Sequence, residues 1–451
     1  MKKKQLRWTL WTIASPFILF IILCILIYLP PIQNFLVDKA AVYASEATGM
    51  NISVGRISLS FPLNLVVTDV DAASPHKDTL LSVRRLQVNV QLLPLLKKQV
   101  EVDGISLQGA TVNSNDLIHG MRLNGTLGEL FISSHGVALD PETAIVNKVL
   151  LKDTDLSLCL NDTAAADTAA SDTTYWKIIL QDIDLQNVSF ALDMPLDSLS
   201  LAASLDNATL RDGLIDLHKS AYSLQTFRIK NGRVRYDSGR PSATASADSL
   251  SAGLDPSHIA LTDIGVKLDS LYYEGRNMKA IISQFVLKER SGVEIVSTEG
   301  RLVSNDKVLR VPSLKLETRD SYLELNAAMD WDALDFKKEG LVSARLMADI
   351  GKPDVVRFMG SMDEKFIRKY PSEPLRIRTG IDGDLNKLKL TTLTAELPGA
   401  LELFAKGELT SLTDSLLRGG DITLQAETKD LKFYLHVGRR NRNSIRNALG
   451  G

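Results

Sequence analysis

Cysteine and histidine are scarce in this chain of 451 residues. The two cysteines are Cys24, inside a long apolar run, and Cys159. They are not placed to pair with each other, so the chain gains no stability from disulfide bonds. The six histidines are scattered, and no two have the spacing of metal ligands. We therefore predict neither a disulfide scaffold nor a metal site.

Recognisable catalytic motifs are also lacking. The sequence contains no G-x-S-x-G elbow, no phosphate-binding P-loop and no dinucleotide fingerprint. The stretch DGDLN at 382–386 opens like a calcium-binding loop. However, Lys387 stands where that loop needs glycine, and Leu393 stands where it needs glutamate, so we interpret the stretch as a polar hairpin turn. With no nucleophile and base to name, we expect a protein that is not an enzyme and that uses no cofactor.

A strong charge imbalance is absent as well. The formal net charge is −2, with 45% hydrophobic and 24% charged residues, which is the balance of an ordinary folded protein. This balance excludes a generally disordered chain. No basic cluster occurs outside the two termini, so the sequence shows no electrostatic footprint for nucleic acid.

One apolar run is long enough to cross a bilayer. No charged residue falls between Arg7 and Asp38, and a membrane-spanning helix needs roughly 20 apolar residues. We predict a transmembrane signal anchor at 8–29, preceded by a basic tail at 1–7 that the positive-inside rule places in the cytoplasm. The aromatic residues expected to hold this anchor in the membrane are Trp8, Trp11, Phe17, Phe20 and Tyr28.

A cleaved signal peptide is the alternative interpretation of the same run. Such peptides have apolar regions of about 7–15 residues, followed closely by a small-x-small cleavage site. Here the apolar run is longer and ends in Pro30-Pro31, with the nearest acceptable site at 42–44. We therefore expect an uncleaved, single-pass anchor, with the bulk of the chain on the far side of the membrane.

After the anchor, the period of the apolar residues changes. Residues 30–49 have a helical period and predict an amphipathic juxtamembrane helix, which either lies on the lipid surface or caps the following domain. From Asn51 the period becomes 2, as in strands with one apolar face. We predict a mainly β protein with a few short helices. Its expected segments are an N-terminal β-domain at 51–160, a low-complexity loop at 161–175, further strands at 176–350, a short helical insert at 351–373, more strands at 374–437 and a polar basic tail at 438–451.

One sequence phrase recurs loosely along the strands. Two apolar positions at i and i+2 are followed by a short polar stretch with Gly, Asn or Asp, and then by two more apolar positions. It occurs near Gly109, Asp153, Asn187 and Asn231. We interpret each polar stretch as a turn between two paired strands, which predicts roughly 25–30 strands in one long sheet that must curl.

Alternation along the strands predicts one apolar and one wet face for this sheet. The apolar face either closes on a dry core, as in a sandwich or solenoid, or forms an elongated hydrophobic groove, which suits lipid tails. The residues expected to line such a groove are Leu86, Val88, Val90, Val100, Val102, Ile105, Leu107, Ile183, Leu185, Leu323 and Leu325.

The order of these features resembles the N-terminal part of the AsmA-like superfamily, of the TamB type. The resemblance is carried by the anchor, the Pro-initiated segment after it, the stretch DTLLSVRRLQVNVQLLPLLKKQVEVDGISLQGATV at 78–112 and the Gly-punctuated strands at 374–412. It implies a Gram-negative inner-membrane protein whose bulk lies in the periplasm as a taco-shaped, apolar β-groove. The implied function is phospholipid transport between the inner and outer membranes.

For TamB-type members the resemblance also implies a role in outer-membrane protein assembly and secretion with a barrel partner. The chain lacks the C-terminal domain by which such members meet that partner, so we expect either a truncated product or a shorter AsmA-like relative. Two functions are thus expected from the sequence: a phospholipid conduit, and a scaffold that acts through exposed strand edges.

Overall fold

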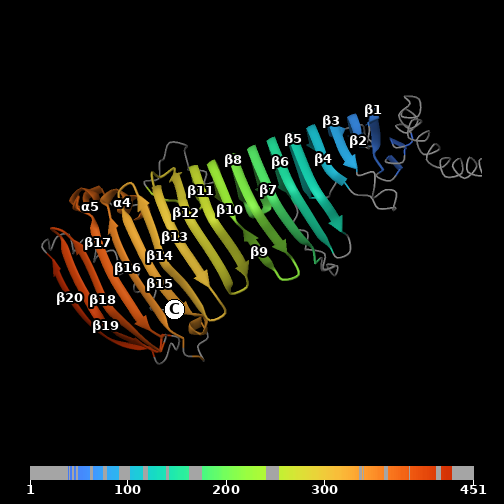
Figure 1. The fold of residues 1–451 in the computed structure, drawn as a ribbon. Coiled ribbons are helices and arrows are strands. Elements are labelled where there is room, and N and C mark those ends of the chain that lie inside the picture. The colour runs from blue at the N-terminus through green and yellow to red at the C-terminus, as the bar shows by residue number, and fades with distance from the viewer. Residues whose placement is uncertain are drawn as a thin grey trace, which may run out of the picture. The chain divides into compact units, whose positions relative to one another are not determined.

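The computed structural model is mainly β, with twenty strands among the residues that it describes (Figure 1). It describes residues 39, 41–42, 45–46, 49–60, 64–74, 79–90, 102–114, 120–138, 142–161, 175–239, 253–334, 338, 340–359, 364–384, 386–412 and 418–428. The predicted anchor with Trp8, Trp11, Phe17, Phe20 and Tyr28 lies outside these residues, as do Val100, the basic tails and most of the low-complexity loop. Within the described ranges, no helix is both long and apolar enough to cross a membrane.

The chain divides into two compact units. Unit 1 comprises residues 1–173 and 178–196, and unit 2 comprises residues 174–177 and 197–451. The division therefore falls after Leu196 and not at the loop that separates the segments 51–160 and 176–350. The physical reason is that the strand following the loop is bonded to the strand preceding it. Asn187 donates a hydrogen bond to Asp153 over 2.8 Å, and Asn147 donates one to Gln181 over 2.8 Å.

In unit 1, strands β1 to β6 form an antiparallel ladder. From β1 to β6 each strand pairs with the next in the chain, so every connection joins neighbours. The strands of unit 1 are β1 (Asn51–Ser60), β2 (Asn64–Ala73), β3 (Thr79–Val90), β4 (Val102–Asn113), β5 (Met121–Ala138), β6 (Thr143–Leu160) and β7 (Lys177–Met194).

In unit 2 successive strands also pair antiparallel, with one interruption. β9 and β10 lie end to end, and both pair with β8 on one side and β11 on the other. From β11 to β20 each strand pairs antiparallel with the next. The strands of unit 2 are β8 (Leu199–Asp216), β9 (Ala221–Leu224), β10 (Thr226–Ser238), β11 (His258–Glu274), β12 (Asn277–Glu289), β13 (Glu294–Ser304), β14 (Val308–Thr318), β15 (Tyr322–Asp330), β16 (Val342–Ile350), β17 (Leu375–Gly383), β18 (Lys387–Leu397), β19 (Leu401–Thr410) and β20 (Gly419–Thr428).

The helices of the described chain are short. α4 (Lys352–Met359) and α5 (Glu364–Lys369) lie in the connection between β16 and β17, where the sequence predicts a helical insert. Two 3-10 helices are η1 (Pro195–Asp197) and η2 (Trp331–Leu334). Figure 1 shows α4 and α5 beside the ends of β16 and β17.

The recurring sequence phrase is not a hairpin, and this prediction was wrong. Each phrase lies inside one long strand, namely β4, β6, β7 or β10. Its polar residue takes a left-handed backbone conformation, with φ of 64° at Gly109, 49° at Asp153, 51° at Asn187 and 54° at Asn231. Gly, Asn and Asp adopt this conformation at least cost. The pairing with the neighbouring strand keeps the same register on both sides of Gly109 and of Asp153, so the residue kinks the strand without inserting an extra position. The chain therefore bends and continues instead of turning back.

Candidate functional site

One face of unit 1 gathers most of the residues predicted to line a groove. Val88 lies directly opposite Ile105, and Leu86 lies opposite Leu107, so all four side chains are on the same face of the sheet. The same face continues on β5 through Ile132 and Leu130, the partners of Ile105 and Leu107. Val90 lies opposite Val102 beyond a shift of register.

The hydrogen bonds of β7 place Ile183 and Leu185 on this face as well. Asn147 is two residues before Val149, whose cross-strand partner is Ile132. Three hydrogen bonds between β6 and β7, namely Asn147 with Gln181, Asp153 with Asn187 and Asp155 with Ser189, join residues 34 positions apart. This constant offset places Ile183 beside Val149 and Leu185 beside Leu151 on the same face.

Leu323 and Leu325 belong to unit 2 and start a second apolar face. Leu325 lies between Leu314 and Leu346 on the flanking strands. Leu323 lies between Leu316 and Ala348 in the same way. The row continues over the following strands through Ile377, Ala395, Leu403 and Ala426.

The opposite face of unit 2 is charged. Lys288 lies 2.9 Å from Asp263, Arg378 lies 2.8 Å from Asp349 and Arg376 lies 3.7 Å from Glu396. These pairs are partly exposed, so each contributes little to stability. They show which side of the sheet faces water, and they leave the leucine-rich side as the candidate site.

Protein covers little of either apolar face. Among the described residues only thirteen apolar side chains are buried, and four of the six that are larger than alanine lie in unit 2. Several large apolar side chains of the unit 2 face are exposed, including Tyr222 at 40%, Tyr273 at 42% and Leu424 at 62% of their surface. The buried apolar residues are Ala72, Leu80, Val83, Ala208, Ala221, Ile264, Val293, Ala333, Ala348, Tyr370, Leu397, Ala400 and Ala405. Large apolar area left open on one face of a sheet marks a binding surface for an apolar ligand or partner.

The helical insert covers one edge of the unit 2 face. Tyr370, just after α5, packs on Leu397 and Ala400 at the turn between β18 and β19. Val355 of α4 and Leu375 at the start of β17 join this cluster. Tyr370 is 7% exposed, and burial raises the pKa of its phenol. The insert thus closes the apolar face at the edge where β17 and β19 begin.

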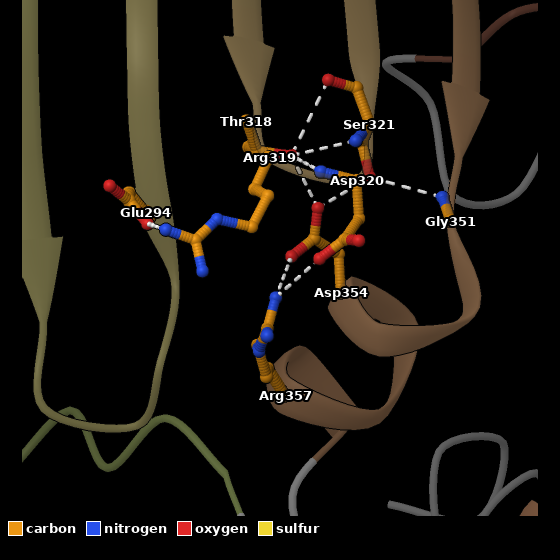
Figure 2. A network of polar contacts seen from close by, with 8 residues as sticks. All are labelled: Glu294, Thr318, Arg319, Asp320, Ser321, Gly351, Asp354 and Arg357. Atoms are coloured by element: carbon orange, nitrogen blue, oxygen red, sulfur yellow. Dashed lines mark hydrogen bonds and ion pairs between the residues drawn. The ribbon is translucent and has the colours of Figure 1, made fainter.

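A buried carboxylate fastens this insert to the sheet. Asp354 of α4 is 1% exposed and accepts hydrogen bonds from the hydroxyl groups of Ser321, at 2.6 Å, and of Thr318 (Figure 2). Arg357 lies 3.0 Å from Asp354 and 2.8 Å from Asp320. Burial of Asp354 disfavours its charged form, but these hydrogen bonds and the Arg357 charge outweigh it and hold its pKa below the ordinary value of 3.8.

The residues of this clasp (Thr318, Asp320, Ser321, Asp354 and Arg357) were not singled out from the sequence. Asp354 and Arg357 read as ordinary first-turn and last-turn charges of a short helix. Their partners are 33 to 37 positions away in the chain, on the turn between β14 and β15. No local pattern connects such positions, so only the folded sheet could have shown the cluster.

No group of His, Cys, Asp and Glu residues in the described ranges is arranged to hold a metal ion. In the stretch predicted to be a polar hairpin turn, Asp384 accepts hydrogen bonds from the backbone amides of Asn386 and Lys387, both over 2.7 Å. The stretch thus connects β17 to β18 as a tight turn.

Comparison with known proteins adds no family. The chain matches no protein-family model and no curated protein sequence. What the structure itself defines is a class: a mainly β protein of sequentially paired strands, with an open apolar face in each unit and a charged opposite face in unit 2.

Proposed function

We propose that the two apolar faces bind the acyl chains of phospholipid. The observation that carries this proposal is the uncovered row of leucine, isoleucine and valine side chains, opposite a face of ion pairs. Each methylene group removed from water contributes about 0.8 kcal/mol, so roughly ten of them on such a face contribute about 8 kcal/mol. No specific polar contact is needed for binding of this strength.

The proposed biological role follows the resemblance of the sequence to the AsmA-like superfamily of the TamB type. In this role the protein is anchored in the inner membrane by residues 8–29, its N-terminus is cytoplasmic and its bulk lies in the periplasm. It carries phospholipid between the inner and outer membranes. Labelling of cysteines introduced into the β units, in intact and in permeabilised cells, tests the orientation.

Substitution on the apolar face tests the binding proposal. Leu325→Asp introduces a charge among Leu314 and Leu346, and it should reduce bound phospholipid and impair the outer membrane. The matched control is Met347→Asp on the adjacent strand, since Met347 is 42% exposed and lies opposite Glu324 on the charged face. Val88→Asp and Val102→Asp make the same test in unit 1. A folded variant that loses its lipid and still supports an intact outer membrane would contradict the transport role.

A scaffold for outer-membrane protein assembly, with a barrel protein as partner, is the alternative function. The observation in its favour is β20, which pairs only with β19 in the described part of the chain. Nine of its ten residues are exposed, including Ile422 at 45% and Leu424 at 62%. An open strand edge of this kind accepts a strand from another protein. Photo-cross-linkers placed along β20 would capture such a partner, and cross-links to lipid alone would count against it.

A further inference from the structure

The two long edges of the unit 2 apolar face differ in chemistry. One edge is closed by α4, α5 and the Tyr370 cluster. The other edge is formed by the opposite ends of the strands, where β11 ends at Glu274, β13 at Ser304 and β15 at Asp330. This second edge has no helical insert of the α4–α5 kind in the described residues, and it holds exposed aromatic and basic side chains.

At this open edge the guanidinium group of Arg276 lies over the ring of Trp331. The indole N–H of Trp331, in η2, donates hydrogen bonds to Ser304 Oγ at 3.1 Å and to the Asn305 carbonyl at 2.8 Å. Ser304 lies opposite Met278, whose neighbours on the same face are apolar. The guanidinium carbon of Arg276 lies 5.6 Å from the centre of the Trp331 ring, within cation–π range. The ring therefore holds a positive charge at the border of the apolar face.

The acidic side chains of this edge are engaged elsewhere. Each of the four carboxylates in the adjoining turns has its own partner, whereas no carboxylate pairs with Arg276 among the residues described. The guanidinium group thus keeps its donors free for a ligand, although carboxylates stand close in the sequence. The engaged pairs are Glu274 with Tyr272, Asp306 with Asn277, Asp330 with the Leu341 amide and Asp332 with Lys338.

Two tyrosines mark the same border. Tyr222 of β9 and Tyr273 of β11 are cross-strand partners on the apolar face, with ring centres 6.1 Å apart. Both rings are about two-fifths exposed. Tyrosine and tryptophan combine an apolar ring with a polar group, and they favour positions where apolar and wet surroundings meet.

We propose that Arg276, seated on Trp331, binds the phosphate of a phospholipid headgroup at the open edge of unit 2. This inference rests on the proposed lipid binding and adds an orientation to it. The acyl chains lie on the apolar face and point toward the edge that α4 and α5 close. Arginine suits this role because its planar donors match phosphate oxygens and because it stays charged at any physiological pH.

A lipid-binding assay with the full chain tests this site. The probes are fluorescent phosphatidylglycerol, which has a phosphate, and fluorescent diacylglycerol, which has the same chains without it. Inorganic phosphate serves as the competitor. The test variant is Arg276→Gln. The matched control is Arg310→Gln, because Arg310 is an exposed arginine near the same edge, opposite Ala328 on the charged face.

We expect Arg276→Gln to weaken phosphatidylglycerol binding about tenfold, the size of one lost charged hydrogen bond, and to leave diacylglycerol binding unchanged. Arg310→Gln should change neither. Equal weakening for both lipids, or no weakening, would overturn the headgroup site. Competition by millimolar inorganic phosphate as strong as that by the lipid would overturn it in favour of a general anion site. If the unaltered chain binds neither lipid, the proposed function fails, and this result is distinct from a failure of the Arg276 site alone.

Discussion

Removal of the Asp354 carboxylate should release α4 from the sheet. Asp354→Ala deletes the acceptor of the Ser321 and Thr318 hydroxyl groups and leaves Arg357 with Asp320 as its one partner in the clasp. Loss of one partner from a buried, hydrogen-bonded charge pair costs about 3 kcal/mol. A loss of this size in local stability corresponds to a roughly 100-fold increase in opening of the helix. The sheet itself should stay folded, because its strand pairing does not depend on the insert.

Amide hydrogen exchange followed by mass spectrometry measures this opening directly, since exchange of buried amides reports local unfolding. Protection of residues 352–359 should fall about 100-fold in Asp354→Ala, while β14 and β15 keep theirs. The matched control is Asp320→Asn, because Asp320 contacts the same Arg357 from a side chain that is 26% exposed. Its loss should cost at most about 1 kcal/mol. Equal effects of the two substitutions, or unchanged protection in Asp354→Ala, would refute the view that the buried carboxylate is the clasp.

Three other measurements test the pH dependence of the clasp, the left-handed position at Asp153 and the exposed strand β20. The pKa of Asp354 in the folded protein lies below its ordinary value of 3.8. The stability that this carboxylate contributes is therefore fully present above that pH, and it is lost as the pH falls through the lower, folded pKa. Amide hydrogen exchange in α4, corrected for intrinsic rates, should accelerate only below about pH 4. Asp153→Val should destabilise unit 1 by about 1–2 kcal/mol more than Asp153→Gly, since φ is 49° there and both substitutions lose the hydrogen bond from Asn187. Urea denaturation followed by far-ultraviolet circular dichroism measures both variants, and equal midpoints would count against a left-handed conformation at Asp153. Leu424→Lys, on the exposed β20 edge, should reduce self-association of the protein in analytical ultracentrifugation. An unchanged distribution of sedimentation coefficients would show that this edge does not mediate self-association.

The strand content of this chain could be predicted from the sequence because alternation is a local signal. Leu86 and Val88 alternate with polar neighbours, and Ile105 and Leu107 do the same, so each pair predicts a strand with one apolar face. The structure places these four side chains opposite one another. The short helical insert could also be predicted, because the strand period of two residues is interrupted between Pro353 and Pro371.

The left-handed kinks inside the strands could not be recognised in the same way. Asp153 and Asn187 are typical both of tight turns and of left-handed positions within a strand. Which of the two forms depends on the neighbouring strand, because a continuous partner keeps the chain running past the polar residue. β5 supplies such a partner, and its pairing with β6 continues on both sides of Asp153. This information is not local, so the sequence alone predicted turns at these positions.

The clasp and the Arg276 edge have the same non-local origin. Asp354 and Thr318 are 36 positions apart, and Trp331 lies on a different connection from Arg276. An isolated Asp, Arg or Trp gives no periodic signal. The antiparallel ladder brings them together because it aligns the ends of successive strands along one edge.

Native mass spectrometry with lipid extraction on the gently purified full chain tests the binding of phospholipid most directly. Phospholipid should be bound to the unaltered protein, in a smaller amount to Leu325→Asp and in an unchanged amount to Met347→Asp. A lipid-free, monodisperse protein would contradict this binding and would leave the scaffold function, acting through β20, as the alternative to pursue.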